Sequence, residues 1–467
     1  MASTARLFDL NIEKILEGWE LCHATREVIA NALNEQALSG TKDISIVRAC
    51  EKQWVIRDYG RGIRYGHLTQ NEDAEKLQNS SKVIGRFGVG LKDALATFNR
   101  RGVDVHIKSR FGEISLLQSA KHGFEDVITL HAAIAPASAP GFHGTEVTLT
   151  GIPDSEVAKA KGFFLKFSGE PQLEATQYGQ ILSPIKGKPS RIYVNGIVVA
   201  EEENFAFSYN ITSLTAAMRR ALNRERTNVG RTAYSDRVKS MLLVASSTAV
   251  ANTLAAELEK VQLGTNADEV KWIDVALHGC QILNATERVV FVDASELVLY
   301  SEAVDRARLD GYRVVTVPEN VREGLRGLKD VVGGDVRDLV AYNTEWLQSF
   351  EFKFVSSREL TRSEREVFEQ GDAIARLIGG LPRAVKEVVI SETMRPEVLG
   401  GGDAHGLWEP STGRIIVKRS QLSSLTTFAG TFLHELAHAK SGFGDASRDF
   451  ERVLTESLGQ VAARALR

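Results

Sequence analysis

Apolar side chains follow a helical spacing near the start of the chain. Over residues 11–38 they fall on one helical face at Ile15, Trp19, Cys22, Ile29 and Leu33. The next stretch, ISIVRACEKQWVIRDYG, alternates apolar and polar residues as two paired strands do. The strand-like segments VDVHIKSR and GTEVTLTG come later. Helices combined with strands up to residue 155 predict an α/β sandwich domain.

The same patterning predicts two further units in the middle of the chain. Residues 156–264 contain RIYVNGIVVA, a hairpin with Asn195 and Gly196 at its turn, and then a basic segment with helical periodicity. Residues 265–357 contain the strands RVVFVDA and YRVVTV, each followed by a helical segment. This order of elements predicts a small α/β module.

The last unit is predicted to span residues 358–467. LTRSEREVFEQGDAIARLIGGL has helical spacing, and KEVVISE and GRIIVKRS are typical of strands. A helix that contains HELAH and a final helix, SRDFERVLTESLGQVAARAL, complete the unit. We therefore expect a multidomain protein of α/β and α+β class: an N-terminal sandwich, α/β domains in the middle and a small C-terminal α+β domain.

Composition and charge narrow the class of protein. A chain of 467 residues is too long for one ordinary core. Its 43% of hydrophobic and 25% of charged residues are typical of a soluble globular protein. The net charge of −3 gives no general attraction to nucleic acid, although the basic residues in the range 219–239 leave nucleic acid open as a regulator.

Cysteine usage and the N-terminal segment bear on location. Three cysteines form neither a disulfide framework nor a metal-ligand spacing, which fits a reducing compartment. The N-terminal segment has acidic residues and no apolar run, unlike a signal peptide. No stretch approaches the roughly 18 apolar residues of a membrane span. These features predict a cytoplasmic protein without a membrane segment.

Four separated motifs in the N-terminal unit carry candidate chemistry. Their residues are Glu27 and Asn31 on the first helix, Asp58, Gly60 and Gly62 after a strand, Gly85, Gly88 and Gly90 before a helix, and Thr145 at the start of a strand. Glycines before a helix let backbone N–H groups approach phosphates. An aspartate can accept a hydrogen bond from an exocyclic amine, and a carboxylate on a helix can orient a water molecule. Taken singly, these motifs are also compatible with a loop, a helix cap or a solvated helix face.

In this order and spacing, the motifs resemble the ATP-binding domain of the gyrase B, heat-shock chaperone, histidine kinase and MutL (GHKL) superfamily over residues 15–155. The resemblance implies an α/β sandwich that binds ATP. It implies Glu27 as general base, Asn31 as the Mg²⁺ ligand and Asp58 as the partner of the adenine amine, with Gly60 and Gly62 beside it and Thr145 supporting the base.

The resemblance also implies a mobile lid over residues 64–84 and a phosphate-binding hinge after it. The hinge residues would be Gly85, Phe87, Gly88, Val89, Gly90, Leu91 and Lys92. Histidine kinases lack the glutamate base, so Glu27 in REVIANAL indicates the ATPase branch. That branch associates as ATP-dependent homodimers through the N-terminal domains, which we expect here as well.

The ATPase branch commonly completes its site with a basic residue from the following domain. The segment LNRERTNVGR carries the candidates Arg224, Arg226 and Arg231. Arginine suits a γ-phosphate because it stays charged and forms bidentate bonds. The alternatives are a salt-bridged surface segment and a nucleic-acid patch.

Near the C-terminus, TFLHELAHAKSG contains a candidate zinc site. His434 and His438 lie one helical turn apart, so both imidazoles can reach one metal ion, and Glu435 beside them can move a proton for a metal-bound water. The motif is similar to that of HExxH zinc peptidases. Upstream, GLWEPSTGRIIVKRS resembles the edge strand that aligns a peptide substrate. The alternative is a helix whose histidines have ordinary hydrogen-bond partners.

The third zinc ligand is open at this point. A metzincin would continue with a histidine, and the chain has none after His438. Glu451 on the final helix resembles the gluzincin arrangement and is favoured. Asp445 is the alternative, although it stands where the N-cap of that helix belongs, and Glu456 ranks behind both.

The leading hypothesis is an ATP-binding and ATP-hydrolysing switch protein that gates a zinc-dependent endopeptidase. The peptidase would act on a specific protein or peptide substrate, in stress or in phage defence. The alternative is a chaperone-like or DNA-associated ATPase whose zinc module is structural. Glu435 argues for the first hypothesis, because a structural site needs no general base.

Overall fold

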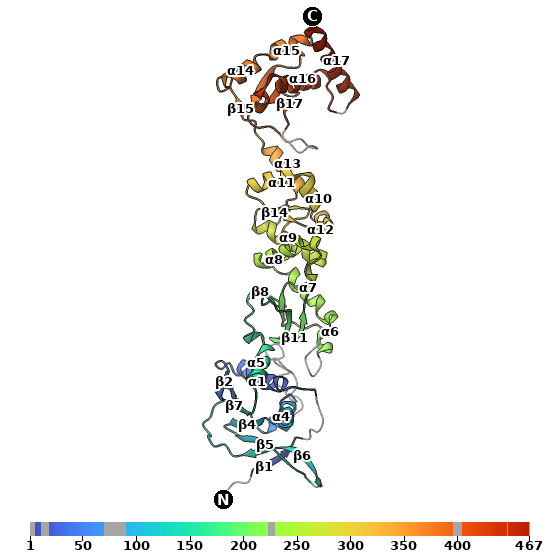
Figure 1. Ribbon diagram of the computed structural model, residues 1–467. Coiled ribbons are helices and arrows are strands. Elements are labelled where there is room, and N and C mark those ends of the chain that lie inside the picture. The colour runs from blue at the N-terminus through green and yellow to red at the C-terminus, as the bar shows by residue number, and fades with distance from the viewer. Residues whose placement is uncertain are drawn as a thin grey trace. The chain divides into compact units, whose positions relative to one another are not determined.

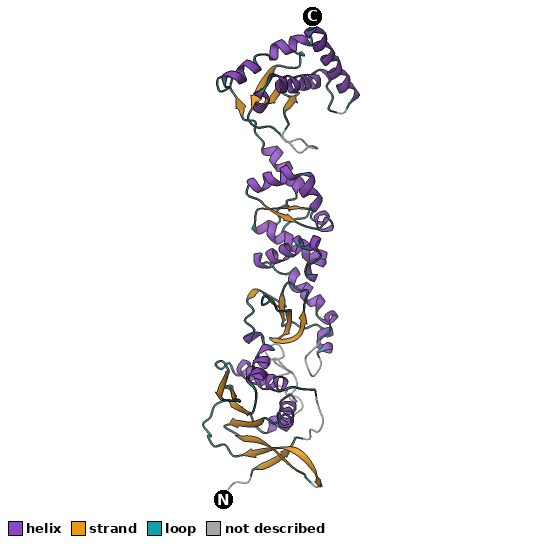
Figure 2. Cartoon of the chain, in the orientation of Figure 1, coloured by secondary structure: helices purple, strands orange, loops and turns teal. Residues whose placement is uncertain are grey.

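The protein is a mixed α/β chain of several sheets and helices, as the sequence predicts (Figures 1 and 2). The computed structural model describes residues 5–10, 18–69, 90–122, 124–222, 229–395, 404–445 and 447–466. It divides into two compact units, Met1–Leu283 and Asn284–Arg467. This division falls inside the predicted module 265–357.

The N-terminal sheet has seven strands in the order β1-β6-β5-β4-β7-β3-β2, and all neighbours are antiparallel. The strands are β1 (Arg6–Asp9), β2 (Ser45–Cys50), β3 (Gln53–Arg57), β4 (Asp104–Ser109), β5 (Gly112–Lys121), β6 (Phe124–Ala135) and β7 (Thr145–Thr150). Helices α1 (Leu21–Ser39) and α4 (Gly90–Arg100) pack on this sheet (Figure 1). The short α2 (Gly66–Thr69) follows β3 in the chain. Ile56, Ile107 and Val147 are opposite one another on three strands and are buried on the helical side.

Local sequence explains where α1 begins and ends. Glu20 caps its N-terminus in a capping box with His23, and Gly40 ends it in the left-handed conformation, with φ of 64°. The hairpin between β2 and β3 confirms the alternation seen in the sequence. The first part of the predicted helix, residues 11–17, lies outside the described residues.

The second sheet has five strands in the order β11-β10-β12-β9-β8. They are β8 (Gln172–Thr176), β9 (Gly179–Leu182), β10 (Ser190–Val194), β11 (Ile197–Glu202) and β12 (Ser208–Ile211). The predicted hairpin turn is confirmed: Asn195 and Gly196 have φ of 49° and 83°, the positive values that a two-residue turn needs.

Helices surround and follow this sheet in the first unit. They are α5 (Asp154–Gly162), α6 (Ala216–Ala221), α7 (Ser235–Leu243), α8 (Thr248–Glu259) and α9 (Ile273–Thr286). Short 3-10 turns lie at η1 (Leu165–Phe167), η2 (Arg231–Ala233), η3 (Val261–Leu263) and η4 (Asp268–Lys271). Gly279 of α9 lies against Leu254 of α8, so α9 packs with the first unit although the sequence analysis placed it in the next module.

The second unit opens with two parallel strands, β13 (Val289–Val292) and β14 (Arg313–Thr316). Their helices are α10 (Ala294–Leu299), α11 (Ser301–Leu309), α12 (Glu319–Gly324) and α13 (Leu339–Ser349). Arg322 is buried and forms ion pairs of 2.8 Å with Glu296 and with Asp338. These groups hold one another inside the module and leave no buried charge uncompensated at Arg322.

The C-terminal sheet has the order β15-β16-β18-β17. Its strands are β15 (Phe354–Val355), β16 (Glu387–Ser391), β17 (Gly406–Glu409) and β18 (Arg414–Lys418), and its helices are α14 (Arg362–Phe368), α15 (Gly371–Leu377), η5 (Arg419–Ser423), α16 (Leu425–Ser441) and α17 (Arg448–Ala465). Because β15 belongs to this sheet, the sheet begins before the predicted boundary at residue 358. Phe428, Phe432 and Leu436 recur every fourth residue of α16 and are buried in the core.

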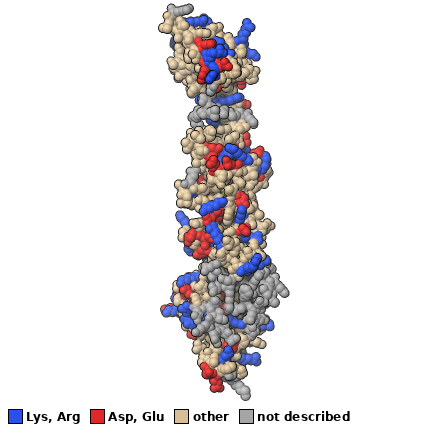
Figure 3. Space-filling view, turned by 90° about the vertical axis from the view of Figure 1, so that its right-hand side faces the viewer, with Lys and Arg blue, Asp and Glu red and all other residues tan. Residues whose placement is uncertain are grey.

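Two surface properties complete the description. Within the described part of the chain, no single helix has the length and apolar character that crossing a membrane requires, although α7 and α8, joined by a 116° bend, pass that test as a pair. On the face seen in Figure 3, basic and acidic side chains are interspersed, in keeping with a net charge of −3.

Candidate functional site

A cavity of about 400 Å³ lies between α1 and the N-terminal sheet. Its lining contains Asn31, Asp58, Gly62, Leu91 and Thr145, which the sequence analysis singled out from four separate motifs. The structure therefore brings these residues together. The predicted hinge residues Gly85, Phe87, Gly88 and Val89 lie outside the described residues, whereas Gly90 and Lys92 stand in the first turn of α4.

Asp58 is fixed at the bottom of this cavity by backbone donors. Its Oδ1 accepts hydrogen bonds from the N–H groups of Gly60 (2.9 Å) and Thr145 (3.1 Å). Burial raises the pKa of Asp58 above its ordinary value, and these two hydrogen bonds oppose that rise only in part. The Thr145 hydroxyl accepts from the N–H of Ile63 at 3.1 Å. One carboxylate and one hydroxyl thus hold the loop that enters the cavity wall.

Gly144 is a residue of this site that the sequence analysis missed. Its φ is +88°, and a Cβ there would lie 2.0 Å from the backbone oxygen of Asp58. Only glycine fits, because both the backbone conformation and the space exclude a side chain. The sequence analysis singled out Thr145, and the glycine directly before it in GTEVTL could have indicated this close backbone contact.

Glu27 is buried beside the start of α4. Its Oε1 accepts from Nε (3.2 Å) and Nη2 (3.0 Å) of Arg26, and a Cβ on Gly90 would lie 2.3 Å from its Oε2. The guanidinium of Arg26 lies over the rings of Trp19 and Phe163. Gly90 thus allows the N-terminus of α4 to approach the carboxylate of Glu27 closely. Arg26 contacts both this carboxylate and the Phe163 ring at the end of α5.

Glu35 and Arg61 form an ion pair in the cavity wall that the sequence analysis did not predict. Glu35 Oε1 lies 3.0 Å from Arg61 Nε and accepts the Arg61 backbone N–H at 2.7 Å. Burial favours a raised pKa for Glu35, but the hydrogen bonds from Arg61 outweigh it, so the pKa lies below its ordinary value. The signal was present, because Glu35 lies four residues after Asn31 on the same helical face.

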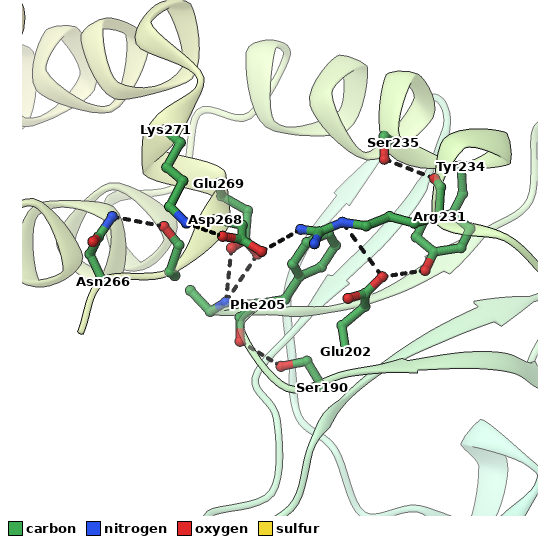
Figure 4. A network of polar contacts seen from close by, with 12 residues as sticks. Ser190, Glu202, Phe205, Arg231, Tyr234, Ser235, Asn266, Asp268, Glu269 and Lys271 are labelled. Atoms are coloured by element: carbon green, nitrogen blue, oxygen red, sulfur yellow. Dashed lines mark hydrogen bonds and ion pairs between the residues drawn. The ribbon is translucent and has the colours of Figure 1, made fainter. Parts of the chain in front are cut away.

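Arg231, one of the three predicted γ-phosphate arginines, is held by carboxylates (Figure 4). Its Nη2 lies 2.6 Å from Asp268 Oδ2, its Nε lies 3.7 Å from Glu202 Oε1, and its guanidinium lies 4.6 Å from the centre of the Phe205 ring. Tyr234 donates to the same Glu202. Arg224 and Arg226 lie outside the described residues.

Asp445 joins the two histidines of the C-terminal helix. The two Nε2 atoms are 3.1 Å apart, and Asp445 Oδ1 lies 3.1 Å from that of His434 and 3.3 Å from that of His438. Among the described residues, these three side chains form a group that could hold a metal ion. Four ligands placed tetrahedrally about 2.0–2.1 Å from zinc lie roughly 3.3–3.4 Å apart, so the spacing fits zinc.

The orientation of His438 also fits a metal ligand. Its Nδ1 lies 2.8 Å from the backbone oxygen of Phe443, which can only accept a hydrogen bond. The Nδ1 therefore carries the proton in the neutral ring, and the lone pair of Nε2 points toward His434 and Asp445. The same three atoms also lie within hydrogen-bond or ion-pair distance of one another, so their spacing is compatible with a metal ion without requiring one.

Glu451, the favoured third ligand, is not part of this group. It is exposed on α17, as is Glu456. The prediction that Asp445 caps α17 is wrong, because the side chain of Ser447 occupies that position and accepts the Phe450 N–H. With the capping role taken, Asp445 is left to face the histidines, and the geometry favours it over Glu451.

Glu435 lies between the helix and the edge strand β17. It is 6% exposed, and burial raises its pKa to about 7, while a hydrogen bond from the Trp408 backbone opposes that rise. A Cβ on Gly406 would lie 2.7 Å from Glu435 Oε1. β17 is at the edge of the sheet, as predicted, and its backbone approaches Glu435 because residue 406 has no side chain.

Comparison with known proteins places part of this chain in a defined family. Residues 155–248 match the family described as the Mycoplasma pneumoniae MPN635 N-terminal domain. An uncharacterized protein of Mycoplasma pneumoniae is 37% identical over 241 residues, which cover 51% of this chain and 96% of that protein. A second uncharacterized protein of that organism is 23% identical over 340 residues, covering 68% of this chain and 94% of its own length. At 37% identity over almost the whole of the first relative, this chain belongs to the same family as that Mycoplasma pneumoniae protein.

Proposed function

We propose that this protein is an ATP-binding and ATP-hydrolysing switch of the GHKL type that controls a zinc-dependent endopeptidase in its C-terminal region. The observation that carries the proposal is the convergence of His434, His438 and Asp445 within metal-ligand spacing, one residue away from a buried glutamate. The N-terminal cavity supports the nucleotide half, because residues from four motifs line it.

In the nucleotide site, each residue would have a separate role. The second oxygen of Asp58 would accept the exocyclic amine of adenine, since the backbone donors occupy Oδ1. Asn31 would offer its amide oxygen to Mg²⁺. Glu27, next to the N-terminus of α4, would orient the attacking water and accept its proton. An arginine of the 224–231 segment would contact the γ-phosphate.

In the peptidase site, zinc would polarise the scissile carbonyl and lower the pKa of a bound water. Glu435 would take the proton of that water and pass it to the departing amine. Burial raises the pKa of Glu435 to about 7, and the charge of a bound Zn²⁺ would lower it toward the carboxylate form that accepts a proton. The free edge of β17 would pair with an extended peptide substrate through backbone hydrogen bonds.

Exposure distinguishes this site from a structural zinc site. The side chains of His434 and Asp445 are 39% and 70% exposed, so a zinc ion held by them would be accessible to water or substrate. Structural zinc sites are closed by four protein ligands. The open side therefore supports a peptidase over a chaperone-like ATPase with a structural metal.

Metal content and cleavage test this function together. Purified protein should bind about one zinc per chain. Glu435→Gln should keep the metal and lose cleavage of a denatured protein substrate, because the ligands remain while the proton acceptor is gone. A wild-type protein that binds no zinc, or a Glu435→Gln variant that cleaves at the wild-type rate, would contradict the peptidase assignment.

A further inference from the structure

Cations and aromatic rings alternate along the end of β3, β4 and β7 in the N-terminal sheet. The Lys42 ammonium lies 3.9 Å from the centre of the Tyr59 ring, and the Arg57 guanidinium lies 5.0 Å from the same centre. Arg57 also lies 4.2 Å from the Phe142 ring, which has Lys108 at 5.3 Å. Two rings thus stand among three cations.

A second group of cations around a ring lies in the loop after β3 and the turn after β4. Arg110 lies 4.7 Å and Arg64 lies 4.2 Å from the centre of the Phe111 ring. All three residues line the cavity, and Phe111 is 39% exposed. We define the cation–aromatic stripe as the cations Lys42, Arg57, Arg64, Lys108 and Arg110 together with the rings of Tyr59, Phe111 and Phe142.

The strand register explains why the middle of the stripe is placed as it is. Arg57 of β3 and Lys108 of β4 are both opposite Glu146 of β7, so all three point to the same face of the sheet. This face is the one opposite the helices, because the preceding or following residues Ile56, Ile107 and Val147 face the helical side. Glu146 forms a 3.6 Å ion pair with Arg57, which neutralises part of the charge there. Lys42, Arg64 and Arg110 are exposed, so the ends of the stripe carry the more available positive charge.

This combination fits one class of partner. A single nucleic-acid strand offers phosphates to the cations and the faces of unpaired bases to rings and guanidinium planes. A duplex hides those faces. Because the net charge of the chain is −3, attraction must come from a local site rather than from the whole protein. We propose that the cation–aromatic stripe binds single-stranded nucleic acid.

Binding of a nucleic-acid strand to the stripe should affect nucleotide exchange in the cavity. Arg64, Arg110 and Phe111 belong to the stripe and also line the cavity. A strand bound to them would hinder access to the cavity and slow nucleotide exchange. This consequence depends on the proposed ATP function, whereas strand binding itself does not.

Fluorescence polarisation of labelled oligothymidylate and oligouridylate strands of about 12 nucleotides tests the proposal on the full chain without nucleotide. Both strands should bind at low salt. If Lys42, Arg64 and Arg110 each meet one phosphate, log Kd should rise with log salt at a slope of about 2. Failure of both strands to bind would overturn the proposal.

Matched variants separate the stripe from general charge. Arg64→Glu/Arg110→Glu should weaken binding by about tenfold or more. Arg308→Glu/Arg362→Glu, which reverses the same charge at two other exposed sites, should leave binding unchanged. Equal losses in both variants would contradict a local site.

The rings provide a test that charge alone does not satisfy. Phe111→Leu should weaken strand binding by about 5- to 140-fold, because stacking contributes roughly 1–3 kcal/mol per base. It should not alter binding of inorganic polyphosphate, which has no bases. Duplex DNA that binds as tightly as the single strand, or an unchanged affinity in Phe111→Leu, would overturn the proposal. Lys42→Gln supplies a milder charge variant if the double reversal fails to fold. None of these readouts requires ATP, so the proposed ATPase function stands or falls separately.

Discussion

The two candidate sites differ in how the chain builds them. The nucleotide cavity draws residues from α1, β7 and the loop after β3, and backbone contacts hold them, such as the two N–H groups on Asp58. The candidate metal group comes from one helix and the loop that follows it. A site assembled over a sheet depends on the whole fold, whereas a site on one helix depends on local spacing and one loop.

This difference predicts that the metal group is easier to remove by single side chains. The double variant His434→Ala/His438→Ala should lower the zinc content from about one per chain to none, because two of its three protein ligands are gone. Elemental analysis of purified protein measures this directly. The nucleotide cavity should bind ATP as before, and loss of both activities would mean that the variant had unfolded.

The third ligand offers a sharper test of the local site. Asp445→Asn should reduce zinc affinity by about tenfold or more, because an amide replaces the charged oxygen near both histidines. Glu451→Gln is the matched control on α17 and should bind zinc normally. Competition with a zinc chelator gives both affinities. The opposite ranking would restore Glu451 as the ligand.

The helical part of each site was predictable, and the loop part was not. His434 and His438 follow from helical spacing, as do Glu27 and Asn31, because a period of 3.6 residues fixes which side chains share a face. The path of a loop has no such period. The sequence analysis favoured Glu451 over Asp445, whereas the structure places Asp445 beside the histidines. Ser447, a preferred N-cap residue at the start of the predicted final helix, was the available signal that Asp445 does not cap it.

The sheet shows the same limit. The hairpins β2–β3 and β10–β11 were predicted from alternation and turn residues. The longest pair, β5 with β6, was not, because the first five residues of β6 are all exposed and the next five all buried, so its pattern lacks alternation. Helical spacing from Asn31 indicated the position of Glu35, but its ion pair with Arg61 was not predictable, because the two residues are far apart in the sequence and meet only in the folded domain.

ATP binding should depend on the carboxylate of Asp58 and not only on a side chain of that size. Asp58→Asn should weaken ATP binding by about 100-fold, because an amide nitrogen in place of the free oxygen would face the adenine amine as a second donor. Isothermal titration calorimetry measures the affinity.

Glu27→Ala should bind ATP normally yet hydrolyse it at least about 100-fold more slowly. Unchanged turnover in Glu27→Ala would remove the general base.

Alanine substitutions at two glycines test whether the backbone of β17 must lie close to Glu435. Gly406→Ala should reduce cleavage and destabilise the protein by about 1–3 kcal/mol, because its methyl group would lie 2.7 Å from Glu435 Oε1 and 2.6 Å from Thr431 Cγ2. Gly430→Ala on α16, where a Cβ meets nothing within 4 Å, is the control. Equal cleavage by both variants would show that β17 does not position Glu435.

The pH dependence of the nucleotide site is the smallest expected effect. Burial raises the pKa of Asp58, so its protonated form stabilises the folded protein and is favoured as pH falls. Adenine recognition needs the carboxylate, so the increase in Tm that ATP causes should shrink as pH falls through this raised pKa. Thermal unfolding with and without ATP measures it. In Asp58→Asn, the remaining increase should not depend on pH over that range.

The central claim is that ATP at the first site controls cleavage at the second. Mapping new protein termini in a cell extract treated with purified protein, with and without ATP, tests it most directly. The account predicts termini that wild-type protein produces, that Glu435→Gln does not, and whose yield changes with ATP and with Glu27→Ala. Termini that are the same in all samples, or that ignore both ATP and Glu27, would contradict it.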